Sequence, residues 1–404
     1  MILDFTSIRN LYKAADTKTV AFLLVKEGSK DEHDIAHLTF RRTFGTRERI
    51  AFEIDHYDWH WVPKVIAEED AFVWRLNMLG GGRLVGLSQR LRRMATLKSF
   101  IQKKSLRFAE GFMLGHNQPQ KSFLTGMRYL PPEGLTDDGI DEKQIGKVED
   151  TEFQRPRDKS VYQPPIILIR KNERLQMGFW DDGALAFTST LVAIGGTTAQ
   201  RPLLKKMYTQ IMDSHRTYRL ACMMHGSKAF VAKATAILKQ DISVLPFPEN
   251  PSELRLSFWE RAIEEDTLDY FSDFVRLGQN SELLLKAANP QNVDKYSALF
   301  CKMLVSVYDN LKADAPIFLD GLICQPFYFG DKPTASVLAQ GQGDALRTLI
   351  YHKHHESLRT VRMLRFYIDN VILIVKPDRL RFWIRSTAIR DADETIISLK
   401  EQGY

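Results

Sequence analysis

The apolar runs of this chain have the length of single β-strands. Examples are residues 20–25 (VAFLLV) and 371–375 (VILIV). Neither approaches the roughly 18 consecutive apolar residues that a membrane-spanning helix needs. Other stretches, such as residues 84–94, repeat apolar residues at helical spacing. Strand-length runs combined with amphipathic helical stretches predict a mixed α/β fold of the α+β class with no membrane span.

The size and the N-terminus set further bounds. A chain of 404 residues predicts two to three domains, because domains commonly contain roughly 100–200 residues. No charged segment followed by an apolar core opens the sequence, so we expect no signal peptide. The three scattered cysteines, Cys222, Cys301 and Cys324, form no disulfide pattern or zinc motif. We therefore expect a cytoplasmic protein.

Residues 75–107 carry nine basic side chains and no Asp or Glu. Apolar side chains recur at helical spacing over residues 84–94, so Arg90, Arg92 and Arg93 are expected mostly on the water-facing side of the predicted helix. Such a surface suits double-stranded DNA, because each neutralised phosphate releases a counterion. The alternative is a solvated helical face that contacts an acidic partner or nothing. The predicted phosphate contacts are Arg83, Arg90, Arg92, Arg93, Lys98, Lys103, Lys104 and Arg107.

Several short motifs suggest chemistry but are better explained by structure. Residues 80–82 (GGG) lack the preceding strand of a nucleotide-binding loop, so a turn between helices is predicted. Residues 181–183 (DDG) predict a tight turn, and Glu53, Asp55 and Asp58 are interpreted in the same way. The basic stretch 365–390 also contains aspartates, so packing and salt bridges explain it at least as well as nucleic-acid binding does.

Histidines are the remaining candidates for catalysis. His33 with His37, and His56 with His60, are each spaced by four residues, but neither pair has the Glu of a zinc hydrolase or a third ligand nearby. No metal site and no catalytic residue is therefore predicted, which favours a binding function. A further polar cluster consists of His352, His354, His355 and Glu356. It resembles the solvated start of a helix. If the chain were instead a nuclease or effector, this cluster would hold the active site. A non-catalytic scaffold is the third hypothesis.

Three groups of segments follow one another in a suggestive order. The first consists of residues 4–9 (DFTSIR), 52–57 (FEIDHY) and 61–63 (WVP). The second consists of residues 111–112 (GF), 129–131 (YLP), 164–170 (PPIILIR) and 186–188 (AFT). The third consists of residues 220–227 (LACMMHGS), 237–242 (ILKQDI) and 245–248 (LPFP). Together they resemble the C-terminal part of large adenine-N6 DNA methyltransferases of type I and type IIG restriction–modification systems.

The resemblance implies four parts. Residues 1–70 would be the β-rich end of a methyltransferase core, and residues 71–110 a basic helical connector. Residues 111–250 would form an α/β target recognition domain. Residues 251–404 would be a mostly helical C-terminal domain, to which no activity is assigned.

The sequence departs from this family at its catalytic motif. The Asn/Asp-Pro-Pro-Tyr/Phe motif is missing, since residues 289–291 (NPQ) do not match it, and so is the glycine loop for S-adenosylmethionine. The resemblance therefore implies that the methyltransferase is split across two chains or that this chain is a fragment. In either case, this chain is expected to bind no cofactor and not to be catalytic alone. It would read the DNA target, and a catalytic adenine methyltransferase chain would bind S-adenosylmethionine and methylate the flipped adenine, in restriction–modification or phage defence. The predicted base-reading residues are Asn117, Gln118, Arg170 and Asn172.

Overall fold

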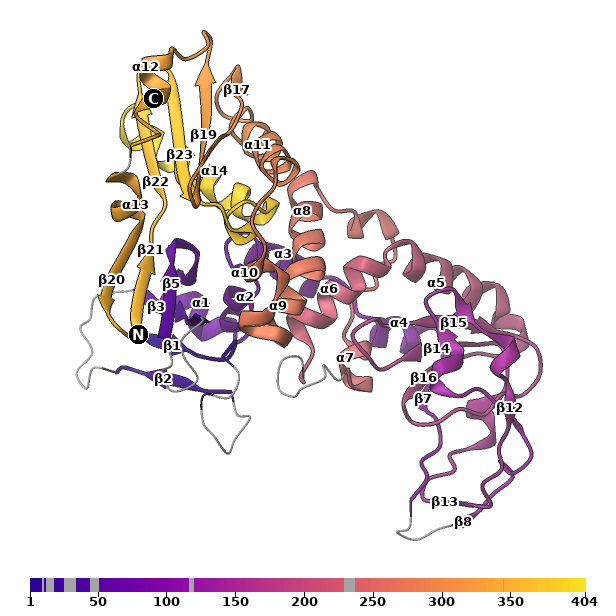
Figure 1. Cartoon of the computed structure of the whole chain (residues 1–404). Helices are drawn as coiled ribbons and strands as arrows, with labels where there is room; N and C mark the ends of the chain where they lie inside the picture. The colour runs from indigo at the N-terminus through magenta and orange to yellow at the C-terminus, as the bar shows by residue number, and fades with distance from the viewer. Residues whose placement is uncertain are drawn as a thin grey trace. The chain divides into compact units, whose positions relative to one another are not determined.

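The chain forms two compact units, described from a computed structural model (Figure 1) that covers residues 1–8, 11, 18–24, 34–43, 51–115, 120–228, 237–343 and 345–404. The terminal unit combines Met1–Leu87 with Leu256–Tyr404, and the middle unit comprises Ser88–Arg255. The fold is mixed α and β with several small sheets, as predicted. The division differs from the four expected parts, because strands near the N-terminus pair with strands near the C-terminus.

The middle unit is built on a four-stranded antiparallel sheet. Its order is β15-β14-β16-β7, with bounds β7 (Arg107–Glu110), β14 (Ile166–Arg170), β15 (Met177–Trp180) and β16 (Leu191–Gly195). Residues 166–169 are fully buried, which explains why this strand is a continuous apolar run. Its burial fixes it in the centre of the sheet, between β15 and β16.

Helices and short strand pairs complete the middle unit. The helices are α4 (Leu97–Lys103), α5 (Arg201–Asp213), α6 (His215–His225) and α7 (Lys239–Ser243). The short antiparallel pairs are β8 (Gln120–Lys121) with β13 (Glu152–Phe153), β9 (Arg128–Tyr129) with β12 (Gly146–Lys147), and β10 (Leu135–Thr136) with β11 (Gly139–Ile140). Residues 131–164 supply much of this region.

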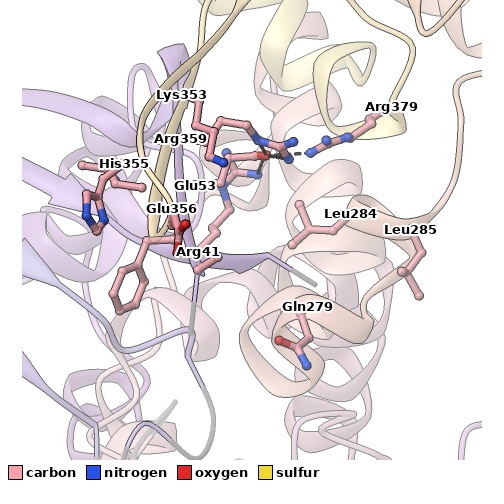
Figure 2. A pocket seen from close by; sticks show the side chains of 13 residues that line it. Arg41, Glu53, Gln279, Leu284, Leu285, Lys353, His355, Glu356, Arg359 and Arg379 are labelled. Atoms are coloured by element: carbon pink, nitrogen blue, oxygen red, sulfur yellow. Dashed lines mark hydrogen bonds and ion pairs between the residues drawn. The ribbon is translucent and has the colours of Figure 1, made fainter. Parts of the chain in front are cut away.

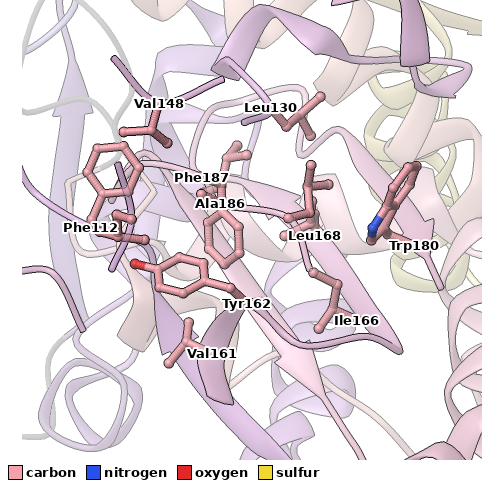
Figure 3. Close-up of a cluster of buried hydrophobic side chains, with 14 of the residues drawn as sticks. Phe112, Leu130, Val148, Val161, Tyr162, Ile166, Leu168, Trp180, Ala186 and Phe187 are labelled. Atoms are coloured by element: carbon pink, nitrogen blue, oxygen red, sulfur yellow. The ribbon is translucent and has the colours of Figure 1, made fainter. Parts of the chain in front are cut away.

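Aromatic side chains from outside the four strands of the sheet close the core of the middle unit (Figure 3). Tyr162 and Phe187 lie edge to face, with ring centroids 5.3 Å apart. Phe112 packs with them, and all three side chains are almost inaccessible to solvent. A loop-rich segment therefore contributes side chains to the same core as the sheet.

The described residues of the terminal unit form three sheets. The first has the order β2-β1-β3-β6, with β1 (Ile2–Asp4), β2 (Val20–Phe22), β3 (Ile35–Thr39) and β6 (Trp59–Val62). The second has the order β20-β21-β5-β4, with β4 (Arg41–Thr43), β5 (Ala51–Asp55), β20 (Tyr351–His355) and β21 (Leu358–Val361). The third has the order β17-β19-β23-β22, with β17 (Leu311–Ala313), β18 (Ile317–Leu319) paired to β19 (Leu322–Phe329), β22 (Leu364–Ile368) and β23 (Val371–Pro377).

The helices of the terminal unit come from both ends of the chain. From the first part come α1 (Lys64–Glu69) and α2 (Val73–Met78), and α3 (Leu84–Arg92) crosses into the middle unit. The later ones are α8 (Phe258–Asp266), α9 (Ser272–Leu277), α10 (Glu282–Leu285), α11 (Pro290–Leu304), α12 (Ala335–Ala339), α13 (Ala345–Ile350) and α14 (Arg385–Glu401). Asn289, whose match to the catalytic motif failed, instead caps α11 by accepting a bond from the backbone N–H of Asn292 at 2.9 Å.

Two features differ from the sequence predictions. The run of histidines at 352–355 is β20 and not the start of a helix, because these residues pair with β21. The C-terminal segment, expected to be mostly helical, also contributes the five-stranded sheet, in which every residue of β23 is buried. Residues 80–82 form the predicted turn between α2 and α3, and all three glycines have positive φ.

One buried ion pair connects β23 to α14. Lys376 donates from Nζ to Oδ2 of Asp391 at 2.7 Å, and neither side chain is accessible to solvent. The hydroxyls of Tyr57 and Tyr296 also donate to this carboxylate, at 2.9 and 2.5 Å. The ring of Trp383 lies 4.4 Å from the ammonium nitrogen.

Among the described residues, no helix is long and apolar enough to cross a membrane.

Candidate functional site

The predicted phosphate contacts lie on α3, on α4 and beside them. Thr96 begins α4 as its N-cap, and its hydroxyl accepts the backbone N–H of Ser99 at 3.2 Å. Capping fixes where the helix starts and therefore which of its side chains face the solvent. Of the eight predicted cations, three are partly buried and form hydrogen bonds with other parts of the protein, and five have exposed side chains.

Arg83 is one of the three partly buried cations. Its guanidinium donates to both carboxylate oxygens of Asp393, from Nε at 2.9 Å and from Nη2 at 2.6 Å. The same group lies over the ring of Trp259, 5.1 Å from its centroid. A bidentate pair stacked on an aromatic ring holds Arg83 to α14 and α8, so its main role is structural.

Two other predicted contacts are partly buried and bind carbonyl oxygens. Arg90 donates to the carbonyl of Glu253 at 2.9 Å. Arg107 donates to the carbonyls of Gln163 and Gly196 at 3.1 and 3.0 Å. These bonds connect distant segments of the middle unit, so both arginines support its fold.

The remaining predicted contacts are exposed: Arg92, Arg93, Lys98, Lys103 and Lys104. Lys103 forms an ion pair with Glu249, in which both side chains are largely exposed. Within the described part of the chain, Arg93 and Lys98 form no ion pair or side-chain hydrogen bond. Arg93 directly follows the last residue of α3, and Lys98 lies in the first turn of α4. These five exposed side chains therefore remain candidates for a cationic binding surface.

The predicted base-reading residues are found in two situations. Asn117 and Gln118 lie outside the described residues. Asn172 donates to the side-chain oxygen of Gln176 at 3.0 Å and accepts the backbone N–H of Leu175, also at 3.0 Å. Arg170 contacts the same Gln176 oxygen at 3.5 Å. Arg170 and Asn172 therefore hold the turn between β14 and β15.

A large charged cluster in the terminal unit was not predicted. It gathers four arginines around three carboxylates from separate parts of the terminal unit: Arg41, Arg359, Arg379 and Arg381 with Glu53, Asp55 and Asp58. The three acids had been interpreted as turn residues. A weak signal was present, because Glu53 and Asp55 are two residues apart on β5 and therefore share one face of the strand.

The acids of this cluster have different environments. Burial alone would raise the pKa of Glu53, but the charges of Arg41, Arg379 and Arg359 outweigh it and lower that pKa. The pKa of Asp55 is lowered in the same way, by Arg381 and Arg41 against its burial. For Asp58, burial dominates and the neighbouring Asp55 adds to it, so its pKa rises to about 6 despite both arginines. The cluster therefore retains a proton more readily at Asp58 than at the other acids.

A pocket of about 590 Å³ opens beside the cluster (Figure 2). Its wall carries four cationic side chains, from Arg41, Lys353, Arg359 and Arg379, and two carboxylates, from Glu53 and Glu356. Glu53 accepts hydrogen bonds from Arg359 and Arg379 on different oxygens, at 2.9 Å from Nε and 2.7 Å from Nη1. The pocket therefore has an excess of positive charge around one neutralised carboxylate.

No group of three or more His, Cys, Asp or Glu side chains among the described residues is placed to hold a metal ion. His37 and His60 lie opposite each other on β3 and β6, with ring centroids 6.0 Å apart. Burial lowers the pKa of His60 well below its usual value, and nearby Arg390 adds to this effect. His37 binds Asn77 at 3.0 Å and Asp4 at 3.3 Å, which makes it a core residue. His33 lies outside the described residues.

Comparison with known protein families and with curated proteins finds no match to this chain.

Proposed function

We propose that this chain is the DNA target-recognition part of a split adenine-N6 DNA methyltransferase that serves restriction–modification or phage defence. The observation that carries the proposal is the exposed cationic surface of α3 and α4, where Arg93 and Lys98 have no acidic partner among the described residues. No Asp or Glu interrupts residues 75–107, so approach of a phosphate backbone meets no repulsion from this segment.

The segments that resemble the methyltransferase family, and their order along the chain, support the same proposal. Many of them lie in the middle unit, where residues 164–170 supply the central strand β14 and its buried flank. A rigid sheet is a suitable support for loops that contact DNA bases. The proposal assigns base reading to the loops around residues 111–130 and 171–183, with Asn117, Gln118, Arg170 and Asn172 as the candidate side chains.

A catalytic partner completes the proposal. This chain lacks the Asn/Asp-Pro-Pro-Tyr/Phe motif and the glycine loop, so the partner chain would hold S-adenosylmethionine and the pocket for the flipped adenine. The role of the present chain is then to position the partner on its target. It contacts phosphates through its exposed cations and bases through its loops.

Transfer of a labelled methyl group from S-adenosylmethionine to double-stranded DNA tests this proposal. The chain is assayed alone and mixed with a methyltransferase chain that carries the missing motifs and is encoded beside it. Activity confined to the mixture is the expected result. Activity of this chain alone contradicts the division of labour, and the absence of methylation from both samples contradicts the proposed function.

A further inference from the structure

The pocket in Figure 2 combines the features of a site for a phosphorylated ligand. Arg359 and Arg379 converge on the two oxygens of Glu53, so their guanidinium groups lie close together. A guanidinium carries five N–H donors in a planar fork that matches phosphate oxygens. Glu53 itself is almost fully buried, whereas the side chains of Arg359 and Arg379 are 39% and 28% exposed. Both cations are therefore fixed at their carboxylate and still accessible from the pocket.

Donors remain available on these cations. The bonds to Glu53 use Nε and Nη2 of Arg359, and Nη1 of Arg379. Within the described part of the chain, Nη1 of Arg359 and both Nε and Nη2 of Arg379 have no hydrogen-bond partner. Lys353 adds an exposed ammonium group to the same pocket. A phosphate group would satisfy these donors and neutralise the excess of positive charge.

Another part of the pocket wall has a different character. Leu284 and Leu285 of α10 line it, and Leu285 is 52% exposed although it is a large apolar side chain. Gln279 also lines the pocket, and its amide nitrogen forms no hydrogen bond with the described residues, whereas its amide oxygen is shielded from solvent. That nitrogen is a donor that a ligand in the pocket can use. A donor and an apolar wall in one pocket suit a flat heterocycle with a ring nitrogen that accepts a hydrogen bond.

From this arrangement we infer that the pocket binds a nucleotide. Its phosphate would be held by Lys353, Arg359 and Arg379, and its base would lie against Leu284 and Leu285 and accept a hydrogen bond from the amide nitrogen of Gln279. The volume of about 590 Å³ lies within the range of small-ligand sites, roughly 300–1,000 Å³. This inference does not depend on the proposed role in DNA methylation, because it involves only the terminal unit.

Calorimetric titration of the full chain with AMP tests the inference. Ribose 5-phosphate, which lacks the base, and adenosine, which lacks the phosphate, are titrated in parallel. AMP is expected to bind more tightly than either fragment. A single-stranded oligonucleotide with a 5′-phosphate then competes with AMP if the natural source is a strand end, and it fails to compete if the source is a free nucleotide.

Variants connect the binding to the pocket. Lys353→Gln is expected to weaken AMP binding about tenfold or more, the effect of losing one charge-assisted hydrogen bond. Arg379→Gln is expected to weaken it at least as much, and Gln279→Leu to weaken AMP but not ribose 5-phosphate. Lys312→Gln, which removes an exposed ammonium from β17 outside the pocket, is the matched control and leaves binding unchanged.

Three results would overturn the inference. They are no AMP binding at millimolar concentration, equal affinity for AMP and ribose 5-phosphate, and AMP binding that Lys353→Gln and Arg379→Gln leave intact. Thermal unfolding of each variant confirms that it is folded. Lys353 is exposed, and its side chain forms no hydrogen bond or ion pair with the described residues, so we expect its substitution to preserve the fold.

Discussion

Lys376 and Asp391 form an ion pair from which solvent is completely excluded, with 2.7 Å between Nζ and Oδ2. Burial lowers the pKa of Lys376 to about 8, although Asp391 acts in the opposite direction. Two tyrosine hydroxyls and an aromatic ring complete the surroundings of the pair. This pair connects the central strand of the C-terminal sheet to the last helix, and so it bears on the stability of the terminal unit.

Replacing Lys376 by Met is expected to destabilise the protein by about 3–5 kcal/mol, because it leaves a buried carboxylate without its counter-charge. Urea unfolding monitored by circular dichroism measures the change. Lys312→Met is the control, since Lys312 is exposed on β17 and its substitution should change the free energy of unfolding by less than about 0.5 kcal/mol. Equal effects of the two substitutions would contradict the importance of the pair.

Glu394 provides a prediction about pH. Its burial is outweighed by the hydrogen bond and charge of His56 and by Arg390 and Arg365, so its pKa falls to about 2. A carboxylate whose pKa is lowered in the folded state contributes stability above its unfolded pKa, near 4.5, and loses it as the pH falls towards 2. Wild-type protein should therefore exceed Glu394→Gln in stability at pH 6, and the difference should shrink by pH 3.

Urea unfolding of both proteins at the two pH values measures this difference. Glu401→Gln removes an exposed carboxylate from the same helix and serves as the control. A stability difference between wild type and Glu394→Gln that stays constant from pH 6 to pH 3 would rule out the proposed linkage.

The glycine turn between α2 and α3 allows a test with two neighbouring positions. Gly81 and Gly82 both have positive φ, +63° and +58°. A Cβ on Gly81 would lie 2.7 Å from the ring of His60, whereas a Cβ on Gly82 would meet nothing within 4 Å. Gly82→Ala should cost about 1–2 kcal/mol for backbone conformation alone.

Gly81→Ala should cost more than Gly82→Ala, because it adds a clash with a buried imidazole. Chemical denaturation of the two single variants gives the comparison. The interpretation fails if both substitutions lower the free energy of unfolding equally.

Binding to DNA can be tested on the exposed cations of α3 and α4. The double substitution Arg93→Gln with Lys98→Gln should weaken binding to all DNA sequences by a similar factor. It should also reduce the salt slope of log K by about 2, one for each lost phosphate contact. Fluorescence anisotropy at several salt concentrations measures both quantities.

A matched pair of substitutions controls for net charge. Lys312→Gln with Arg362→Gln also removes two exposed cations, both of them in the terminal unit. The proposed interface would be refuted by an unchanged salt slope in the α3–α4 variant, or by equal losses in the two variants.

Local sequence patterns predicted elements whose residues share one property, such as burial along a whole strand or the backbone freedom of consecutive glycines. The apolar runs at 166–170 and 371–375 became the buried central strands β14 and β23, and the glycines at 80–82 became a turn. Strand pairing was not predictable, because it depends on partners far away in the chain. The histidines at 352–355 have no strand pattern of their own, and their pairing with β21 makes them a strand.

The charged cluster escaped prediction for the same reason. Glu53 and Asp55 were recognisable as acids near a turn, but three of the four arginines in the cluster come from residues 359–381. Nothing in the spacing along the chain joins the two segments. The exposure of Arg92 and Arg93, by contrast, was predicted from helical periodicity alone, because exposure of a helix face is a local property. Arg90, which was predicted to be exposed in the same way, is partly buried.

The parallel pairing of β5 with β21 has a consequence for synthesis of the protein. Glu53 and Arg359 are 306 positions apart, so the ribosome must add the whole intervening segment before they can meet. At about 5–20 residues per second, β5 waits roughly 15–60 s for its neighbour. The middle unit is continuous in sequence and can fold during that interval. A nascent chain stopped soon after residue 255 should therefore contain a protease-resistant middle unit and an N-terminal segment that is still open to cleavage.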